Sequence, residues 1–514
     1  MSDIRDLDIR TSEGTPFEWG AIGAESVRRV AVVDVGSNSV RLVVFDGVAR
    51  SPAYFYNEKI LCGLGAGLQQ TGKLNPEGRA RALSALRRFV ALSRVMKITQ
   101  MSGVATAAVR EAEDGTDFVA QVSAETGLKL HVASGEEEAQ LAAKGVLLGW
   151  PQATGMVCDI GGASMELARV DHGIIGVRGT SPLGPLRLAH AGGPGDIDRE
   201  IAKEVRQLQH KVSGAARKLY LVGGSWRAIA RLDMERRGYP LKVLHEYRLA
   251  PEDVLATCDW IAGQTPVELS RHTDTSMARL ELVPLAARVL SCLVGELNPE
   301  SLSVSSYGLR EGMLYELMPD TLRARDPLIE AARYMERQRA RFPGFGKVLF
   351  RWLQPLYHTA SQSELRLIKA ACLLHDITWR THPDYRAEVC FETVTRANLS
   401  GVDHEGRVYL ALAILNRYKN SRKTQFADDL IALLPEARAV HAETLGRAIR
   451  LGAMLSGAAP GTLEGTELEL TDTTVSLVLK QPSLDLTGEV VERRLASLAS
   501  HLGKDAAIRV ASEN

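Results

Sequence analysis

Cysteine is scarce in this chain, and long continuous apolar stretches are missing from it. Six cysteines occur among 514 residues without any Cys-x-x-Cys pair, so neither a disulfide framework nor a zinc site is implied. No run reaches the roughly 18 apolar residues that a membrane span requires. The opening MSDIRDLDIRTSEGTPFEWG also lacks the basic-then-apolar order of a signal peptide. We therefore expect a cytoplasmic protein without a membrane anchor, in which residues 1–28 form a flexible tail.

The chain also lacks a net charge. Lys plus Arg number 62 and Asp plus Glu number 62, which argues against a generally basic nucleic-acid-binding surface and leaves room only for a local basic groove. Apolar residues make up 45% and charged residues 24%, as in ordinary folded proteins. At roughly 150 residues per domain, this length predicts three to four domains.

The first half alternates between strand and helix patterns. Two apolar runs within residues 29–45 flank a small polar turn and predict a hairpin. The segments that follow are, in order, a helix over 77–97, a strand over 103–108, a helix near 117–126, a strand over 128–134 and a helix over 135–149. Such alternation predicts an α/β domain, which we place at residues 29–152.

The same plan then restarts. Residues 155–170 predict a second hairpin, followed by a helix over 197–217, a strand over 218–222 and a helix over 225–236. Two halves that each open with an Asp-containing hairpin turn indicate a structural duplication with a cleft between the halves. We place the second lobe at residues 153–320.

Beyond residue 320 the strand signals fade. Residues 321–425 carry helical patterns, and strand-like pieces return at 467–471 and 474–479. We expect a helical domain over 321–425 and a small α+β domain over 426–514.

The turn of each predicted hairpin carries residues that suit phosphate chemistry. In the first, Asp34-Val35-Gly36-Ser37-Asn38-Ser39 offers backbone N–H groups to an anion, with Arg41 beside it. In the second, Asp159 precedes Gly161 and Gly162, and strand alternation puts Ser164 and Glu166 on one face. Mg²⁺ bound to phosphate is held by one or two such carboxylates. A plain hairpin turn accounts for either motif alone, but two equivalent turns weaken that reading.

Three further motifs are weak singly. Gly223-Gly224-Ser225 lies at a strand-to-helix junction, where free N–H groups face an anion. Glu138 falls in an acidic first helical turn, which by itself only complements the helix dipole. Arg110 follows a predicted strand and by itself would be solvated or paired.

Taken together, the motifs are specific. The ordered set DVGSNSVRL, TAAVR, SGEEEA, DIGGASME, LVGGS and SSYGLREGML resembles the exopolyphosphatase/guanosine pentaphosphate phosphohydrolase (Ppx/GppA) family of the actin/Hsp70/sugar-kinase superfamily. The resemblance implies an α/β fold of two actin-like (ribonuclease H-like) lobes around a central cleft. A helical HD-like domain and a small C-terminal α+β domain would follow. It also implies a homodimer.

The same resemblance implies a role for each motif. Glu138 matches the general base that activates water, and Arg110 matches an arginine that binds the substrate phosphate. Asp159 and Glu166 match acids linked to Mg²⁺ (or Mn²⁺) and to water positioning. The remaining phosphate-binding positions are Ser37, Asn38, Ser39 and Arg41 in the first loop, Gly161, Gly162, Ala163 and Ser164 in the second, and Gly223, Gly224 and Ser225 in the third. Superfamily kinases hold adenosine at this third loop.

The sequence departs from the family pattern in the second and third loops. Ala163 stands for a usual Gly and Met165 for a usual Thr, and Ser225 replaces a usual Thr in the third loop. Ala resists positive φ, so the second loop is expected to sit slightly differently. Asp159, Ser164 and Glu166 are all retained, which makes the departures tolerable.

The helical region carries two further signals. Leu373-Leu374-His375-Asp376 resembles an HD-domain signature, with His358, His382, Asp384 and His404 as nearby candidate ligands. Without a clear fourth ligand, a buried His-Asp pair is the favoured reading over a metal site.

Basic residues also cluster in this region. Residues 321–351 hold eight Lys/Arg against three acids, and the set Arg417, Lys419, Arg422 and Lys423 forms a second group. Solvated helix faces explain many such charges. The alternative is a channel that guides a polyanion towards Glu138.

The leading functional hypothesis is therefore an exopolyphosphatase that releases terminal phosphate from inorganic polyphosphate. Hydrolysis of guanosine pentaphosphate (pppGpp) is the nearest alternative, because it uses the same catalytic half. A small-molecule kinase is disfavoured by Glu138 and the helical extension. A non-catalytic alarmone sensor would require Glu138 to point away from the cleft.

Overall fold

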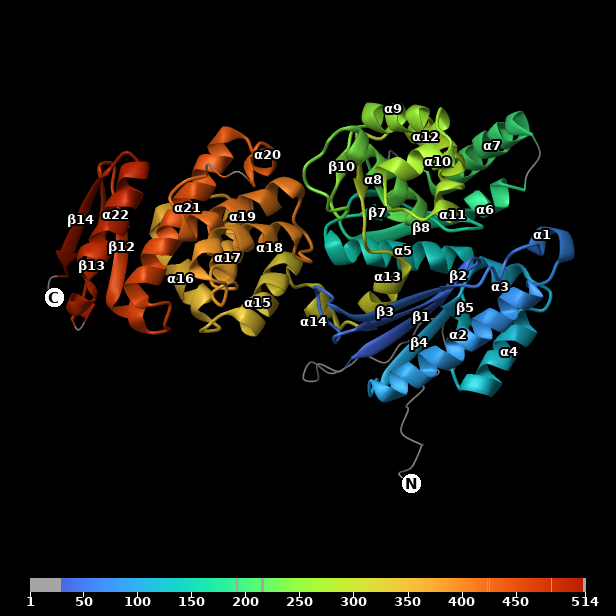
Figure 1. Cartoon of the computed structure of the whole chain (residues 1–514), viewed down its shortest axis with the longest axis horizontal. Helices are drawn as coiled ribbons and strands as arrows, with labels where there is room; N and C mark the ends of the chain where they lie inside the picture. Colours follow the sequence, from blue (N-terminus) through green and yellow to red (C-terminus); the bar gives the residue numbers. More distant parts are fainter. Residues whose placement is uncertain are drawn as a thin grey trace, which may run out of the picture. The chain divides into compact units, whose positions relative to one another are not determined.

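The computed structural model describes residues 29–190, 193–213, 217–422, 424, 426–481 and 483–511. The chain divides into two compact units, one ending at Arg325 and the other starting at Asp326 (Figure 1). The predicted tail over residues 1–28 lies outside the described residues. No helix in the described ranges is long and apolar enough to cross a membrane.

The first half of unit 1 is a five-stranded sheet in the order β3-β2-β1-β4-β5. The strands are β1 (Val30–Val35), β2 (Ser39–Phe45), β3 (Tyr54–Leu61), β4 (Gln100–Ala105) and β5 (Leu130–Val132). β1 and β2 form the predicted antiparallel hairpin, and β1 pairs in parallel with β4. Strand β3 is an edge strand that the sequence patterns had not indicated.

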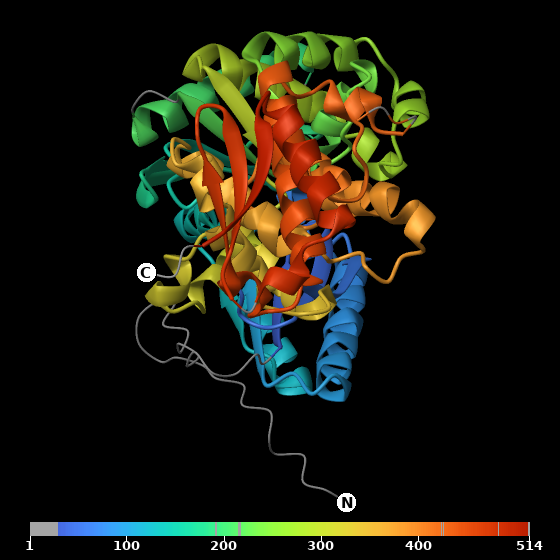
Figure 2. The same cartoon turned by 90° about the vertical axis from the view of Figure 1, so that its left-hand side faces the viewer.

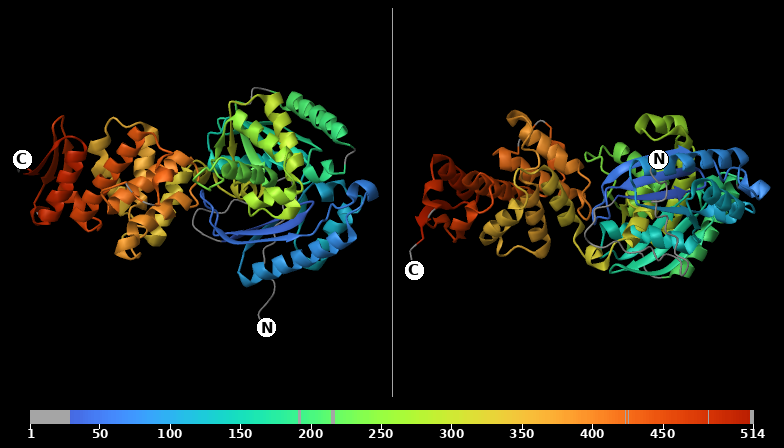
Figure 3. Two further views of the ribbon diagram at one scale, coloured as in Figure 1. Left: turned by 45° about the horizontal axis from the view of Figure 1, so that its top comes forward. Right: turned by 90° about the horizontal axis from the view of Figure 1, so that it is seen from below.

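Strand alternation assigns the two faces of this sheet to different helices. Val33 and Leu42 share a core with buried residues of helices α2 (Pro76–Val95) and α4 (Gly115–Thr126), and helix α3 (Ala107–Glu111) follows β4. Val32 and Val43, on the opposite face, pack with helices α5 (Gly135–Gly149) and α13 (Leu309–Glu316). Figure 3 shows the blue sheet between helix α2 and the green second half.

The second half repeats the plan with six strands in the order β10-β11-β9-β6-β7-β8. The strands are β6 (Gly155–Ile160), β7 (Met165–Asp171), β8 (Ile174–Ser181), β9 (Lys218–Gly223), β10 (Arg248–Leu249) and β11 (Ser301–Val304). One face of this sheet packs on helices α7 (Pro194–Val212), α8 (Gly224–Arg236), α9 (Pro251–Ala262) and α12 (Val283–Leu297). The other face packs on α5. Helix α5 therefore has a sheet on either side.

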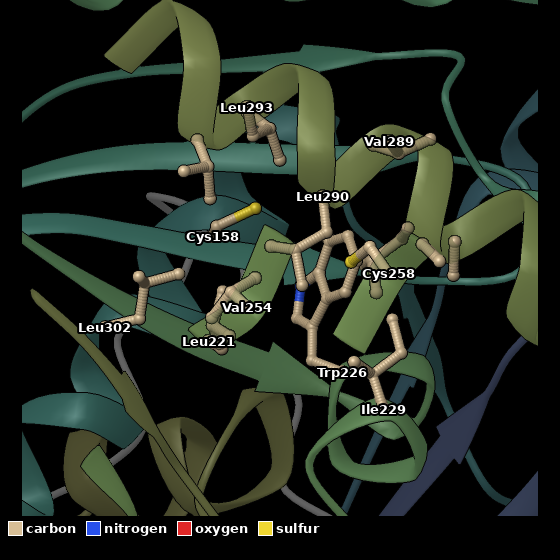
Figure 4. Packing of buried hydrophobic residues seen from close by; sticks show 14 of the residues in the cluster. Cys158, Leu221, Trp226, Ile229, Val254, Cys258, Val289, Leu290, Leu293 and Leu302 are labelled. Atoms are coloured by element: carbon tan, nitrogen blue, oxygen red, sulfur yellow. The ribbon is translucent and has the colours of Figure 1, made fainter. Parts of the chain in front are cut away.

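Trp226 anchors the start of helix α8. Its side chain is fully buried and lies among Cys258, Leu290 and Ile229 (Figure 4). Because Trp226 follows Gly224 by two residues, its burial fixes the third glycine loop at the end of β9.

Helix α13 does not lie where the sequence placed it. The predicted boundary assigned it to the second lobe, yet its Met313 and Leu314 pack on the first sheet and on α5. The two helices approach so closely that a Cβ added at Gly312 would collide with the carbonyl of Leu141. This crossing brings the end of unit 1 back to the first half.

Unit 2 is mainly helical and ends in a small three-stranded sheet. The helices are α15 (Pro327–Arg339), α16 (Phe345–Leu353), α17 (Gln362–Leu374), α18 (Arg386–Arg396), α19 (His404–Tyr418), the short α20 (Asp428–Ile431), α21 (Glu436–Ser456) and α22 (Glu489–His501). The strands are β12 (Thr466–Leu470), β13 (Thr474–Leu479) and β14 (Asp505–Val510), in the order β12-β13-β14. Helix α21 packs on α19, and α22 packs on both α21 and β14 (red in Figure 2). Residues 326–514 form one compact unit, in which the predicted boundary at residue 425 falls between α19 and α21.

Candidate active site

A cleft of about 270 Å³ opens between the two halves of unit 1. The turns of both hairpins, the β9–α8 loop and the first turn of α5 contribute to its lining. The predicted residues that line it are Ser37, Asn38, Ser39, Arg41, Glu138, Asp159, Gly161, Gly162, Ala163, Ser164, Glu166, Gly223, Gly224 and Ser225. Folding thus brings together segments separated by up to about 190 positions.

Backbone hydrogen bonds hold the first two loops. The carbonyl of Ser37 accepts from Gly65 N at 2.8 Å, and that of Asn38 accepts from Cys62 N at 2.9 Å. In the second loop, Gly161 N donates to Ser164 O at 2.9 Å. Ala163 does not adopt positive φ, so its methyl group brings no backbone strain.

The third loop needs a glycine where it meets the second. Gly223 has φ +113°, and a Cβ there would lie 2.5 Å from the carbonyl of Ile160 and 2.9 Å from an oxygen of Asp159. The loop therefore packs directly behind the Asp159 carboxylate.

Three carboxylates enter the cleft from different elements. Glu138 stands in the first turn of α5, and Asp159 pairs with Glu166 across the β6–β7 hairpin. Glu138 is 7% and Glu166 3% exposed. Burial raises the pKa of Glu138 to about 7, although the Arg110 guanidinium on that carboxylate opposes the shift. Burial also raises the pKa of Asp159 to about 6.

Glu166 is the most deeply desolvated of the three. Burial and then the charges of Glu138 and Asp159 raise its pKa, while a hydrogen bond from Thr180 Oγ1 at 3.0 Å stabilises its charged form. For all three carboxylates, the cost of burial outweighs the stabilisation that neighbouring positive charges and hydrogen bonds give to the ionised form.

Arg110 does not line the cleft. Its Nη1 donates to the Glu138 carboxylate and to the carbonyl of Ala133. In the structure it holds Glu138, and its predicted contact with the substrate phosphate stays a prediction.

Several cations line the cleft that the sequence did not single out. They are Lys59 from β3, Arg227 from α8, Arg279 from the short helix α11 (Met277–Leu280) and Arg310 from α13. Arg310 was within a quoted motif, but no local pattern marked the others. Asp34 also lines the cleft, and Arg310 Nη1 donates to it at 2.8 Å.

The cations repel one another. Burial, followed by the charges of Arg279, Arg41 and Arg310, lowers the pKa of Lys59 to about 8. Burial and then Arg310 lower the pKa of Arg227 to about 10. An arrangement in which like charges are crowded around a cavity is stabilised when a polyanion enters it.

Sequence profiles agree with this geometry. The profile described as the Ppx/GppA phosphatase family matches residues 43–321, more than half of the chain. A second profile, described as the C-terminal part of exopolyphosphatase, matches residues 328–509.

The chain belongs to the Ppx/GppA phosphatase family.

Curated proteins similar in sequence to this chain are named for two activities. "Exopolyphosphatase 2" of Mycobacterium tuberculosis is 26% identical over 319 residues, covering 57% of this chain and 99% of the relative. A "Guanosine-5'-triphosphate,3'-diphosphate pyrophosphatase" of Aeromonas hydrophila is 24% identical over 365 residues, covering 68% and 72%.

Solved structures show the same fold. A crystal structure of an exopolyphosphatase from Cytophaga hutchinsonii has a TM-score of 0.51 at 23% identity and covers 56% of this chain and 97% of that one. A structure titled exopolyphosphatase-like protein has a TM-score of 0.52 at 24% identity, with 57% and 99% covered. Unit 1 is therefore the actin-like core expected of a Ppx/GppA protein.

The cleft of this Ppx/GppA protein fits a phosphate-bound divalent cation. The described residues contain no cluster of three or more His, Cys, Asp or Glu that could hold a metal ion alone. Mg²⁺ needs only one or two carboxylates when phosphate oxygens and water complete its shell. Asp159 and Glu166 face each other across the hairpin, and burial raises the pKa of both because too little positive charge offsets it. These two carboxylates offer that donor set.

The HD-like pair in unit 2 is engaged within the protein. Asp376 accepts from Arg341 Nε at 2.7 Å and Nη2 at 2.9 Å, so a guanidinium occupies its oxygens. His375 Nδ1 donates to the carbonyl of Cys372 at 2.8 Å, and burial lowers its pKa to about 4. The four other candidate ligands do not join the pair in a metal-binding group. These contacts engage Asp376 and His375 Nδ1, whereas His375 Nε2 is buried without a hydrogen-bond partner among the described residues.

The predicted basic channel is only partly exposed. Arg417 is buried against the ring of Tyr418. Arg422 pairs with Glu436 and lies 3.7 Å from Glu443. Lys419 is exposed, and Lys423 lies outside the described residues. The charge of Arg422 is therefore already balanced.

Proposed function

We propose that this chain is an exopolyphosphatase, which hydrolyses the terminal phosphoanhydride bond of inorganic polyphosphate with Glu138 as general base and Mg²⁺ as cofactor. The observation that carries the proposal is the meeting of two charge groups in one cavity. Carboxylates with raised pKa values lie on α5 and the second hairpin, and cations with lowered pKa values lie opposite. Membership of the Ppx/GppA family supports it.

The chain's own residues supply most of the chemistry. Glu138 takes a proton from the water that attacks the terminal phosphorus, and Arg110 orients the carboxylate. The bond between that phosphorus and the bridging oxygen breaks, which yields inorganic phosphate and a chain shorter by one phosphate. Mg²⁺ held by Asp159 and Glu166 would neutralise charge on the phosphate oxygens.

The loops and cations bind the substrate. The turns at Ser37–Ser39 and Gly161–Ser164 present backbone N–H groups to the terminal phosphate. Lys59 and Arg279 bind the phosphates next to the terminal one in the chain. Both side chains line the cavity, and neither forms an ion pair with an acidic residue among the described residues. Positioning and charge neutralisation are what phosphoryl transfer mainly requires.

One contact favours a phosphate chain over a nucleoside. A Cβ added at Gly224 would collide with the guanidinium of Arg279. The third loop, which holds adenosine in superfamily kinases, is thus covered by a cation. This placement disfavours the kinase reading, and the presence of Glu138 in the cleft lining disfavours the sensor reading.

The test measures phosphate release from the purified full-length chain with Mg²⁺ or Mn²⁺. Long-chain polyphosphate and pppGpp are compared at matched concentrations of terminal phosphate. Faster release from polyphosphate supports the proposal, and preference for pppGpp would make the alternative activity correct. Release from neither substrate would contradict both.

A further inference from the structure

A row of three polar side chains crosses the second sheet on the face that packs on helix α5. Asp159 lies opposite Glu166 on β6 and β7, and Glu166 lies opposite Thr180 on β7 and β8. Direct cross-strand partners point to the same face of a sheet. Val157 and Ala168, two positions along from Asp159 and Glu166, pack on α5 and therefore mark that face.

Thr180 holds one oxygen of the Glu166 carboxylate. Its Oγ1 donates to Glu166 Oε1 at 3.0 Å, and the Ser164 hydroxyl also stabilises the ionised form of this carboxylate. No cation among the described residues pairs with Glu166, which is buried. A buried carboxylate without a cation depends on such donors, so loss of the Thr180 hydroxyl leaves a buried acceptor unsatisfied.

The start of α5 fixes Thr180 from the other side. A Cβ added at Gly135, the first residue of α5, would lie 2.3 Å from Thr180 Cγ2 and 2.8 Å from its Oγ1. This approach leaves no room for a side chain at Gly135, and it limits the rotamers open to Thr180. Glu138 stands in the same helical turn, so Thr180 links the helix that carries the base to Glu166.

We propose that Thr180 is a positioning residue for the divalent cation that Glu166 would hold. By occupying Oε1, its hydroxyl leaves Oε2 as the oxygen for the cation, and it ties the carboxylate to the start of α5. Thr180 is not among the described residues that line the cleft, so it acts through Glu166. The inference rests on the role of Glu166 in the proposed function.

Binding of Mn²⁺ to the full-length chain tests the proposal without catalysis. Free Mn²⁺ is measured by its electron paramagnetic resonance signal, with inorganic phosphate at a fixed concentration. Thr180→Val keeps the shape of the side chain but replaces the hydroxyl by a methyl group, so the dissociation constant for Mn²⁺ should rise about 10–100-fold. Thr180→Ser keeps the hydroxyl and should bind Mn²⁺ like the wild type. Equal binding by the wild type and Thr180→Val overturns the proposal, as does a wild type that binds no Mn²⁺.

Two further variants separate this contact from general effects of substitution. Ser181→Ala removes the neighbouring hydroxyl, which donates to the carbonyl of Met165, and should leave the dissociation constant unchanged. Gly135→Ala adds a methyl group against Thr180 and should weaken Mn²⁺ binding in the same direction as Thr180→Val. Equal weakening by Ser181→Ala overturns the proposal. If Thr180→Val does not fold, unchanged binding by Gly135→Ala overturns it.

Phosphate release separates this proposal from the proposed activity. In an active enzyme, the Mn²⁺ concentration for half-maximal release from polyphosphate should rise in Thr180→Val. Most of kcat should return at saturating Mn²⁺, because the substitution weakens cation binding and leaves Glu138 in place. An unshifted Mn²⁺ requirement overturns the positioning role. A wild type that releases no phosphate contradicts the proposed activity, and the order of Mn²⁺ affinities among the variants then still decides the role of Thr180.

Discussion

Replacing Glu138 by Gln isolates its role as a base. Gln keeps the length of the side chain and an oxygen that can accept from Arg110, but it cannot take a proton from water. A positioned general base contributes about 10²–10⁴-fold to rate. We therefore expect kcat for phosphate release from polyphosphate to fall by about 10²–10⁴-fold in Glu138→Gln, with little change in KM.

The pH profile gives the same residue a second readout. Burial raises the pKa of Glu138 to about 7, so protonation removes the base at a higher pH than for an ordinary carboxyl. The free enzyme's kcat/KM should therefore fall about tenfold per pH unit below about 7, and it should fall again above about 8, where Lys59 loses the proton that gives it its positive charge.

The neighbouring Glu136 provides the control. Its side chain is exposed, lies two residues earlier on α5 and pairs with Lys211 at 2.8 Å. Glu136→Gln removes one negative charge from the same helical turn and should retain wild-type kcat. The reasoning is refuted if Glu138→Gln keeps more than about a tenth of wild-type kcat while melting like the wild type.

Four further outcomes follow from the proposed site and from particular contacts. Arg279→Met should raise KM for polyphosphate by about tenfold or more, measured by steady-state phosphate release, because a charged hydrogen bond is worth about 1.5–3 kcal/mol; an unchanged KM would contradict its placement on the substrate. Gly312→Ala should destabilise unit 1 by about 1–3 kcal/mol, because the added methyl strikes the Leu141 carbonyl; calorimetry with an unshifted unit 1 transition would disprove the close crossing. A chelator should abolish phosphate release and leave the melting temperature of unit 2 unchanged; a shift of that temperature would instead indicate a metal at the HD-like pair. Asp376→Ala should lower the melting temperature of unit 2, because it removes the carboxylate that pairs with Arg341.

The sequence by itself determined the local elements and the motifs they carry. Apolar runs on either side of a small polar turn predicted the hairpins that became β1–β2 and β6–β7, and α5 begins and ends where its pattern indicated. Strand alternation placed Glu166 on the cleft face and Met165 in the core, as found. These features depend on residues that are neighbours in the sequence, whose order of apolar, polar and turn-forming side chains indicates the local structure.

Only the tertiary structure decided how the cleft is charged. Lys59, Arg227 and Arg279 reach it from β3, α8 and α11, elements that are distant in sequence and carry no shared local pattern. The same holds for helix α13, whose hydrophobic pattern fits a core without stating which sheet it packs on. Arg110 donates to Glu138 because a cation beside a buried carboxylate lowers the free-energy cost of burying its charge. Burial and proximity across the fold set these partners and pKa values, and no sequence spacing encodes either.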